Sequence, residues 1–77
     1  MEIQRELTGD ELFEELGYEK LTNKGIYGEK ISVIYKNKNY EYISFWLNYK
    51  KVHTAKAILS LQELQAINQK CKELGWI

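Results

Sequence analysis

Residues 30–47 read KISVIYKNKNYEYISFWL, and this stretch decides the fold that we expect. Residues 30–36 and 40–48 are rich in β-branched and aromatic side chains, and the polar residues 37–39 separate them. Two such runs on either side of a short polar loop are typical of an antiparallel hairpin. We expect Asn39 to take the left-handed position of a three-residue loop, because asparagine tolerates positive φ.

The length of this loop fixes the register of the hairpin. A three-residue loop pairs Val33 with Ile43, whereas a loop one residue longer would place Val33 beside Tyr42 and split the apolar face. The shorter loop gives one face that can be buried, made of Ile31, Val33, Ile43, Phe45 and Leu47, and an opposite face made of Ile34, Tyr40, Tyr42, Ser44 and Trp46.

The segments next to the hairpin are less regular. A third strand is predicted at about Val52–Ala57, after a turn at residues 48–51, and the alternation of its side chains leaves its register open. Residues 19–29 include two glycines and are interpreted as a loop. Ile26 and Tyr27 are expected to anchor this loop to the core.

Two helices flank the strands, and both begin with the same signal. Each start has the spacing of a capping box, formed by Thr8 with Glu11 in the first helix and by Ser60 with Glu63 in the second. Both helices close on the sequence Glu-Leu-Gly-aromatic, in which glycine adopts the left-handed conformation readily. The expected inward faces are Leu12, Phe13 and Leu16 in the first helix, and Leu64, Ile67, Cys71 and Leu74 in the second.

These elements predict a single domain over residues 1–77, of the α+β class. The expected order is helix, three-stranded antiparallel meander, helix (αβββα), folded as a two-layer sandwich in which both helices cover the aliphatic sheet face. A chain of 77 residues buries roughly 60% of its unfolded surface, so its core is just sufficient.

Composition argues against catalysis and against metal binding. His53 is the only histidine and Cys71 the only cysteine, so the ligand set of a zinc site is missing. Cys71 lies on the apolar helical face, where a small core residue is expected, and His53 is expected to be a partly exposed strand residue beside Trp46 or Leu47. The acids of the first helix suit caps and the helix dipole, and we expect them to keep ordinary pKa values. We therefore expect no enzyme activity and no cofactor.

Charge is balanced overall but unevenly placed. The net charge is zero with a pI of about 6.6, which is less basic than a dedicated duplex-DNA binder usually is. Residues 1–19 hold seven acids and residues 20–56 hold eight lysines. The N-terminus has no apolar signal core, no apolar run approaches ~20 residues, and one cysteine suits a reducing compartment, so we expect a cytoplasmic protein without a membrane partner.

One surface of the predicted sheet calls for a functional interpretation. Large aromatic side chains on an exposed sheet face, with lysines at the rim, are typical of a binding surface. The candidate partner-binding residues are Tyr40, Tyr42, Trp46, Lys36, Lys38, Lys50 and Lys51. The alternatives are that the N-terminal segment, the 19–29 loop or a second copy of the chain covers these aromatics.

Three segments, at residues 7–18, 43–45 and 64–76, give the chain a resemblance to a group of short, uncharacterised proteins of bacteriophages and prophages in low-GC Gram-positive bacteria. Together they span about half of the chain. The resemblance implies a phage accessory protein that acts in the cytoplasm of the bacterial host. It brings no known activity and no known site residues.

The sequence thus leads to one main functional hypothesis and two alternatives. The main one is a non-enzymatic protein-binding module, as a phage accessory protein or a host-directed inhibitor, of which anti-defence action is one version. The first alternative is a single-stranded nucleic-acid-binding protein, whose bases stack on Tyr42 and Trp46 while lysines contact the phosphates. The second is a homodimer formed through the aromatic face.

Overall fold

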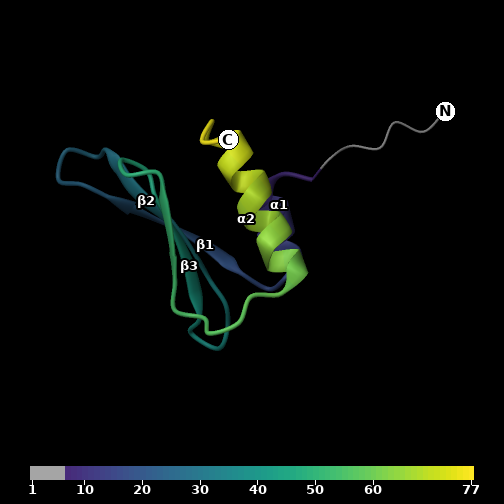
Figure 1. Cartoon of the computed structure of the whole chain (residues 1–77). Helices are drawn as coiled ribbons and strands as arrows, with labels where there is room; N and C mark the ends of the chain where they lie inside the picture. Colours follow the sequence, from purple (N-terminus) through teal and green to yellow (C-terminus); the bar gives the residue numbers. More distant parts are fainter. Residues whose placement is uncertain (1–6) are drawn as a thin grey trace.

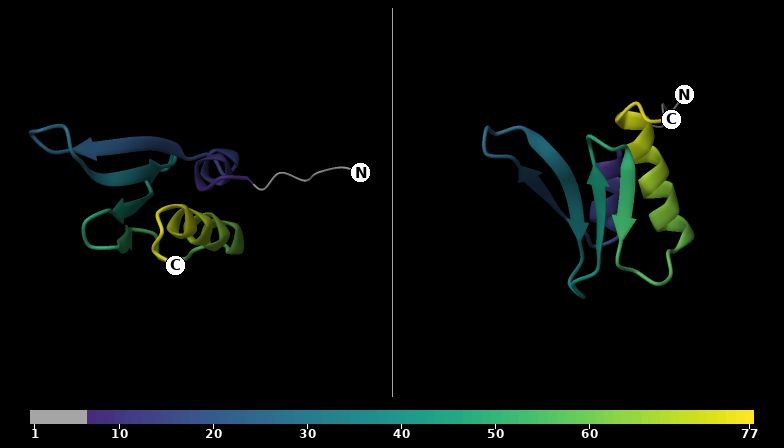
Figure 2. Two further views of the ribbon diagram at one scale, coloured as in Figure 1. Left: turned by 90° about the horizontal axis from the view of Figure 1, so that it is seen from above. Right: turned by 60° about the vertical axis from the view of Figure 1, so that its left-hand side comes forward.

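The computed structural model describes residues 7–77 of the chain. The elements follow in the order α1 (Gly9–Glu15), β1 (Glu19–Lys24), β2 (Lys30–Lys36), β3 (Tyr42–Trp46), β4 (Lys51–Thr54) and α2 (Leu61–Glu73). The strands form one antiparallel sheet in the order β1-β2-β3-β4, and both helices lie on the same side of it (Figures 1 and 2). The α+β class is therefore confirmed, whereas the three-stranded meander is wrong by one strand.

Both predicted capping boxes are present. The Thr8 hydroxyl accepts from the Glu11 amide at 3.1 Å, and the Glu11 carboxylate accepts from the Thr8 amide at 3.0 Å. Ser60 and Glu63 repeat the arrangement at 3.1 Å and 2.8 Å. Each box satisfies amides at the start of its helix that would otherwise lack a partner.

The predicted helix ends are also present. Gly17 has a φ of 88° and Gly75 a φ of 76°, which places both in the left-handed region. The amide of Tyr18 then donates to the Phe13 carbonyl at 2.9 Å, and the two rings meet edge to face. At the second helix the amide of Trp76 donates to the Cys71 carbonyl, also at 2.9 Å.

The segment interpreted as a loop at residues 19–29 contains the additional strand. Residues 19–24 form β1, which pairs with β2 along the edge of the sheet and has only exposed side chains. Its tight turn extends away from the helices, so Ile26 and Tyr27 are 90% and 88% exposed (Figure 1). The expectation that these two residues anchor the segment to the core is wrong.

The hairpin of β2 and β3 has the predicted faces but not the predicted register. Val33 pairs with Phe45, two residues away from the expected Ile43, because the loop comprises residues 37–41. The Asn37 side chain accepts from two backbone amides within the loop, and Tyr40, with a φ of 61°, takes the left-handed position expected of Asn39. A shift of two residues conserves the alternation, so the side chains that remain in the two strands keep their faces.

The strand predicted at Val52–Ala57 is shorter and begins one residue earlier, at Lys51. Its register, which the sequence left open, places Val52 opposite Phe45 and His53 opposite Ser44. β4 is the second edge of the sheet.

The core is built around stacked aromatic rings between α1 and the sheet. Phe13 stacks on Tyr35 at 4.0 Å between centroids, and Phe45 meets both rings edge to face at 6.1 Å and 5.7 Å. Each such pair contributes about 1 kcal/mol beyond the burial of its area. Ile43 completes this fully buried group.

The second helix is rotated from the predicted orientation. Ile67, Cys71 and Leu74 pack against the core as expected, but Leu64 is 49% exposed. The buried residues of α2 are Glu63, Ala66 and Lys70. Lys70 crosses α1 so closely that a Cβ on Gly9 would lie 3.0 Å from the Lys70 Cβ, and this contact sets how the two helices meet.

Candidate functional site

The sheet has one face under the helices and one face directed away from them, here called the open face. Successive strand residues alternate between the two, so Phe45 is 0% exposed while its neighbour Trp46 is 38% exposed. The two unlike sides predicted for this strand are therefore confirmed. The open face of the two central strands carries Ser32, Ile34, Tyr42, Ser44 and Trp46, and β4 adds Lys51 and His53.

The predicted binding residues fall into two groups at opposite ends of β3. Tyr40, Lys36 and Lys38 gather at the 37–41 loop, where the Lys36 ammonium lies 5.6 Å from the centroid of the Tyr40 ring. Tyr40 is not part of the strand alternation, because the longer loop contains it, and this corrects the prediction of three aromatics along one strand.

The second group lies at the other end of β3 and surrounds Trp46. Lys51 is its cross-strand partner, and Lys50 occupies the turn that connects β3 with β4. Tyr42 belongs to the first group, because it begins β3 and is the cross-strand partner of Lys36, and its ring centroid lies 5.7 Å from that of His53. The structure therefore brings Trp46, Lys50 and Lys51 together and separates them from Lys36, Lys38 and Tyr40.

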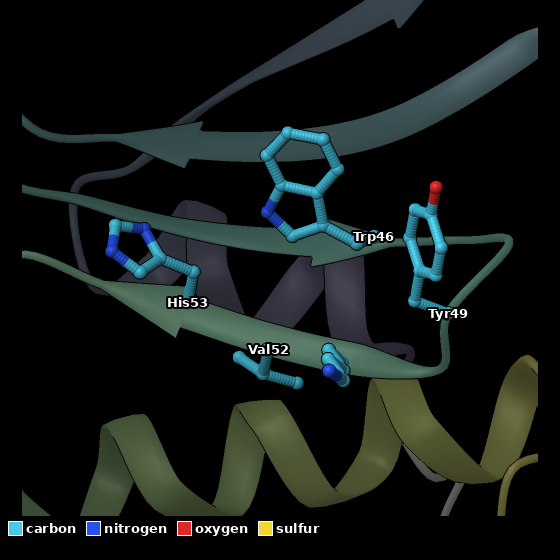
Figure 3. Close-up of a pocket in the computed structure, with 5 residues that line it drawn as sticks. Trp46, Tyr49, Val52 and His53 are labelled. Atoms are coloured by element: carbon cyan, nitrogen blue, oxygen red, sulfur yellow. The ribbon is translucent and has the colours of Figure 1, made fainter.

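An open hollow lies beside Trp46 and is lined by Trp46, Tyr49, Lys51, Val52 and His53 (Figure 3). The Trp46 and Tyr49 rings stand next to each other above the sheet, and His53 lies on the adjoining strand (Figure 3). Tyr49 reaches this position because its amide donates to the Trp46 carbonyl at 3.3 Å, which folds the turn back. We call this feature the Trp46 hollow.

Tyr49, Val52 and His53 were not among the residues predicted for the site. Their place depends on the register of β4 and on the turn before it, neither of which the alternation of side chains determines. The described residues that line the Trp46 hollow include one formal charge, on Lys51, and it is positive. The hollow thus offers apolar and aromatic surface next to a cationic rim.

The single cysteine and the single histidine lie in different layers. Cys71 is on α2 and packs against the core, where burial raises the pKa of its thiol. His53 is on the open face of β4, opposite Ser44 and across the sheet from the helices. His53 shares the hollow with Trp46, as expected, but it does not neighbour Leu47 in the strand pairing.

Asp10, at the start of α1, is the centre of a polar cluster that the sequence did not reveal. Its carboxylate accepts from the Tyr35 hydroxyl, from Lys20 Nζ at 2.8 Å and from Lys70 Nζ at 3.1 Å. Partial burial alone would raise the pKa of Asp10, but the bonds from Lys20, Tyr35 and Lys70 outweigh it and hold this pKa well below its usual range. The expectation of ordinary pKa values in this helix is wrong for Asp10.

Glu63, at the start of α2, is the centre of a second cluster. It accepts from the Tyr18 hydroxyl and from Lys56 Nζ at 2.6 Å. Burial opposes ionisation, but the bonds from Lys56, Ser60 and Tyr18 lower the pKa of Glu63 to about 2. Burial and then the bond to Glu63 raise the pKa of Tyr18.

The two clusters suit structural clamps better than acid–base catalysis. Each holds a carboxylate ionised and a phenol protonated at neutral pH, whereas a general acid or base works best with a pKa near the operating pH. Within residues 7–77, every buried side-chain polar atom has a hydrogen-bond partner.

Residues 7–77 contain no group of three or more His, Cys, Asp or Glu side chains arranged to hold a metal ion. Neither described helix has the length and apolar character needed to cross a membrane.

Comparisons with known proteins do not identify a family. No family model matches the chain, and neither the curated proteins nor the solved structures include a significant match. The predicted resemblance to phage proteins therefore stays a prediction, and function has to be argued from the surface itself.

Proposed function

We propose that the protein is a non-enzymatic binding module that contacts a protein partner through the Trp46 hollow and its lysine rim. The observation that carries this proposal is the half-exposed indole of Trp46 on a paired strand, next to the exposed ring of Tyr49. Tryptophan and tyrosine are enriched among the residues that contribute most to binding energy at protein interfaces.

The strands hold the indole in a defined position. Trp46 pairs with Ser32 on β2 and with Lys51 on β4, so its backbone is fixed on both sides. A side chain that is already ordered loses little conformational entropy when a partner covers it. Covering the remaining 38% of its surface would contribute about 2 kcal/mol at the usual value per unit of apolar area.

The lysines give the surface a preference for acidic partners. Lys51 lines the hollow and Lys50 precedes it in the turn, and both are exposed. Rim charges act mainly on the association rate and on partner choice, and their effect falls with rising salt. The mechanism would be occlusion of an acidic surface on the partner.

The biological setting follows from the resemblance alone. A phage or prophage accessory protein of this size would act in the cytoplasm of the bacterial host by binding a host or phage protein. Host-directed inhibition, including anti-defence action, is the version that best fits a rigid domain with one exposed aromatic surface.

The test is affinity capture from bacterial lysate with three immobilised forms of the protein. Wild type and Tyr27→Ala are expected to retain the same partner, and Trp46→Ala is expected to lose it. Tyr27 is the matched control because it is an exposed aromatic at the tip of a different hairpin. Equal recovery on all three forms, or recovery on none, would contradict the proposal.

A second candidate function uses the same face for single-stranded nucleic acid. The observation that favours it is the presence of lysines at both ends of the aromatic row, Lys36 and Lys38 at one end and Lys50 and Lys51 at the other. Bases would stack on Tyr42 and Trp46. Titration with oligonucleotides at rising salt separates the two functions, since phosphate contacts give a steep salt dependence.

A further inference from the structure

We infer that the partner presents an extended acidic segment, which adds to the sheet as a fifth strand along β4 and places one large apolar side chain in the Trp46 hollow. This inference rests on the proposed function and names the class of partner for the same surface. It combines three features that meet at one edge of the sheet: an edge strand, an apolar hollow and a cationic rim.

The first feature is the free edge of β4. β4 is the last strand of the sheet within the described residues. The Leu47 amide donates to the Ile31 carbonyl, so by alternation the odd-numbered residues of β3 bond toward β2 and the even-numbered ones toward β4. Trp46 and Ser44 therefore face Lys51 and His53, and the backbone groups of Val52 and Thr54 are directed outward.

Those outward groups can receive a short strand. Val52 and Thr54 each carry one donor and one acceptor, which is enough to fix the register of a segment of about four residues. Addition of a strand at such an edge is a recurring mode of peptide recognition, in which the backbone gives affinity and alternate side chains give specificity.

The second feature determines one of those side chains. A strand beside β4 would direct every second side chain onto the open face, next to Lys51 and His53. The Trp46 hollow lies on this face, where the side chains of Trp46, Tyr49 and His53 form its aromatic walls. A large apolar side chain in this position would bury surface against Trp46 and Tyr49 (Figure 3).

The third feature determines the charge of the flanking positions. Lys50 and Lys51 are exposed at the start of β4, and the described lining of the hollow carries no negative charge to neutralise them. Aspartate or glutamate next to the apolar side chain would complement them. Pairing of β4 with β4 of a second copy would add more lysines and no acid to complement them, so an acidic partner fits better.

The experiment uses the full chain and a display library of random ten-residue peptides. Panning on the wild-type protein is expected to enrich sequences with one large apolar residue flanked by aspartate or glutamate. The enriched peptide is then synthesised with a fluorophore, and its binding is measured by anisotropy against wild type and variants. Panning that enriches no sequence, or sequences without acidic residues, would overturn the inference.

Two changes test the strand addition itself. Val52→Pro removes an outward amide and keeps the side of β4 that pairs with β3, so it should weaken binding by about tenfold, the amount expected for a lost hydrogen bond. N-methylation of alternate peptide amides, in two phased sets, makes the same test without altering the protein. The set that blocks the amides facing β4 should lose binding and the other set should keep it.

A charge exchange tests the role of the lysines. The double variant Lys50→Glu, Lys51→Glu should reject the acidic peptide and accept a peptide in which lysine replaces each acid. If the double variant binds the lysine-containing peptide, it is folded, and a folding defect cannot explain its loss of binding to the acidic peptide.

The outcomes separate this inference from the proposed function. Strand addition would be overturned if the peptide bound Val52→Pro as tightly as wild type and both N-methylated peptides bound equally well. If Trp46→Ala still abolished peptide binding, the proposed function would remain. Lysate capture that does not depend on Trp46 would instead contradict the proposed function itself.

Discussion

The hydroxyl of Tyr18 donates a hydrogen bond to the carboxylate of Glu63, a residue 45 positions further along the chain. The same carboxylate accepts from Lys56 Nζ at 2.6 Å and from the Ser60 amide at 2.8 Å. One buried group therefore joins the end of α1, the segment after β4 and the start of α2. This clamp holds both helices in place under the sheet.

Replacement of Glu63 by glutamine is expected to destabilise the protein by about 3 kcal/mol. Glutamine can still complete the capping box, but the largely buried Lys56 would lose its carboxylate partner at 2.6 Å and keep only the more distant Glu41, at 3.8 Å. For a domain of this size the loss corresponds to a fall in Tm of about 12–24 °C. Thermal unfolding followed by circular dichroism measures it, with Glu15→Gln on the exposed side of α1 as the control. A fall of less than about 3 °C for Glu63→Gln would contradict the clamp.

The same clamp should make stability depend on pH in the acid range. The pKa of Glu63 falls from 4.5 to about 2 on folding, so its contribution is fully present above about pH 4.5 and is lost as the pH falls toward 2. Asp10, whose pKa is also lowered, acts in the same direction. Urea unfolding at several pH values should show the difference in stability between wild type and Glu63→Gln shrinking over this range. A difference that stays constant down to pH 2 would show that the Glu63 charge is not what the fold uses.

Gly9 should resist replacement even by alanine. In most helices this change is stabilising, because glycine costs up to about 1 kcal/mol relative to alanine. Here the new Cβ would meet the Cβ of Lys70 at 3.0 Å and its backbone at 3.1 Å, so the helices would have to separate. We expect Gly9→Ala to destabilise by about 1–3 kcal/mol, as overpacking does. Urea unfolding measures the sign, and a stabilised variant would show that α1 and α2 are not in close contact at this point.

The features of the fold that depend only on residues close together in the sequence could be predicted. The capping boxes at Thr8 and Ser60 and the glycine closures need only residues within one or two helical turns. The strand β1 could not be predicted in the same way. Every one of its side chains is exposed, so it lacks the apolar alternation that marks a half-buried strand.

The register of the central hairpin shows how a partly wrong prediction can still place a site. The Asn37 side chain bonds to two amides and stabilises a loop that is two residues longer than expected. Because two is an even number, Trp46 stays on the open face and Phe45 in the core. Tyr40 lies inside the loop and is therefore not one of the aromatic residues of the open face. The residues of β4 that neighbour Trp46 could not be predicted, because the alternation of side chains does not determine the register of β4.

The two carboxylate clusters had no signal in the sequence. Asp10 and Glu63 meet Tyr35 and Tyr18 over separations of 25 and 45 residues. In the sequence each acid has a sufficient local explanation as part of a helix start. Only the tertiary arrangement shows that the same carboxylates also bind phenols in the interior.

The two sides of β3 lead to a final prediction, which compares neighbouring aromatic residues. Phe45 is fully buried against Phe13 and Tyr35, so Phe45→Ala should cost about 3–5 kcal/mol and leave the domain largely unfolded. Trp46→Ala removes a larger side chain from the opposite face, yet it should cost less, about 2–3 kcal/mol, because part of the indole is already in contact with solvent and its loss leaves no internal cavity.

Chemical unfolding of both variants measures the two losses of stability. Iodide quenching of tryptophan fluorescence, compared between the single-tryptophan variants Trp46→Phe and Trp76→Phe, gives an independent check. The protein that retains Trp46 should be quenched more strongly, since Trp76 packs against Phe45 at 6.2 Å between ring centroids. If Trp46→Ala unfolds the domain as Phe45→Ala does, then the indole stabilises the fold rather than serving a partner. The open face would then lose the residue on which its proposed function depends.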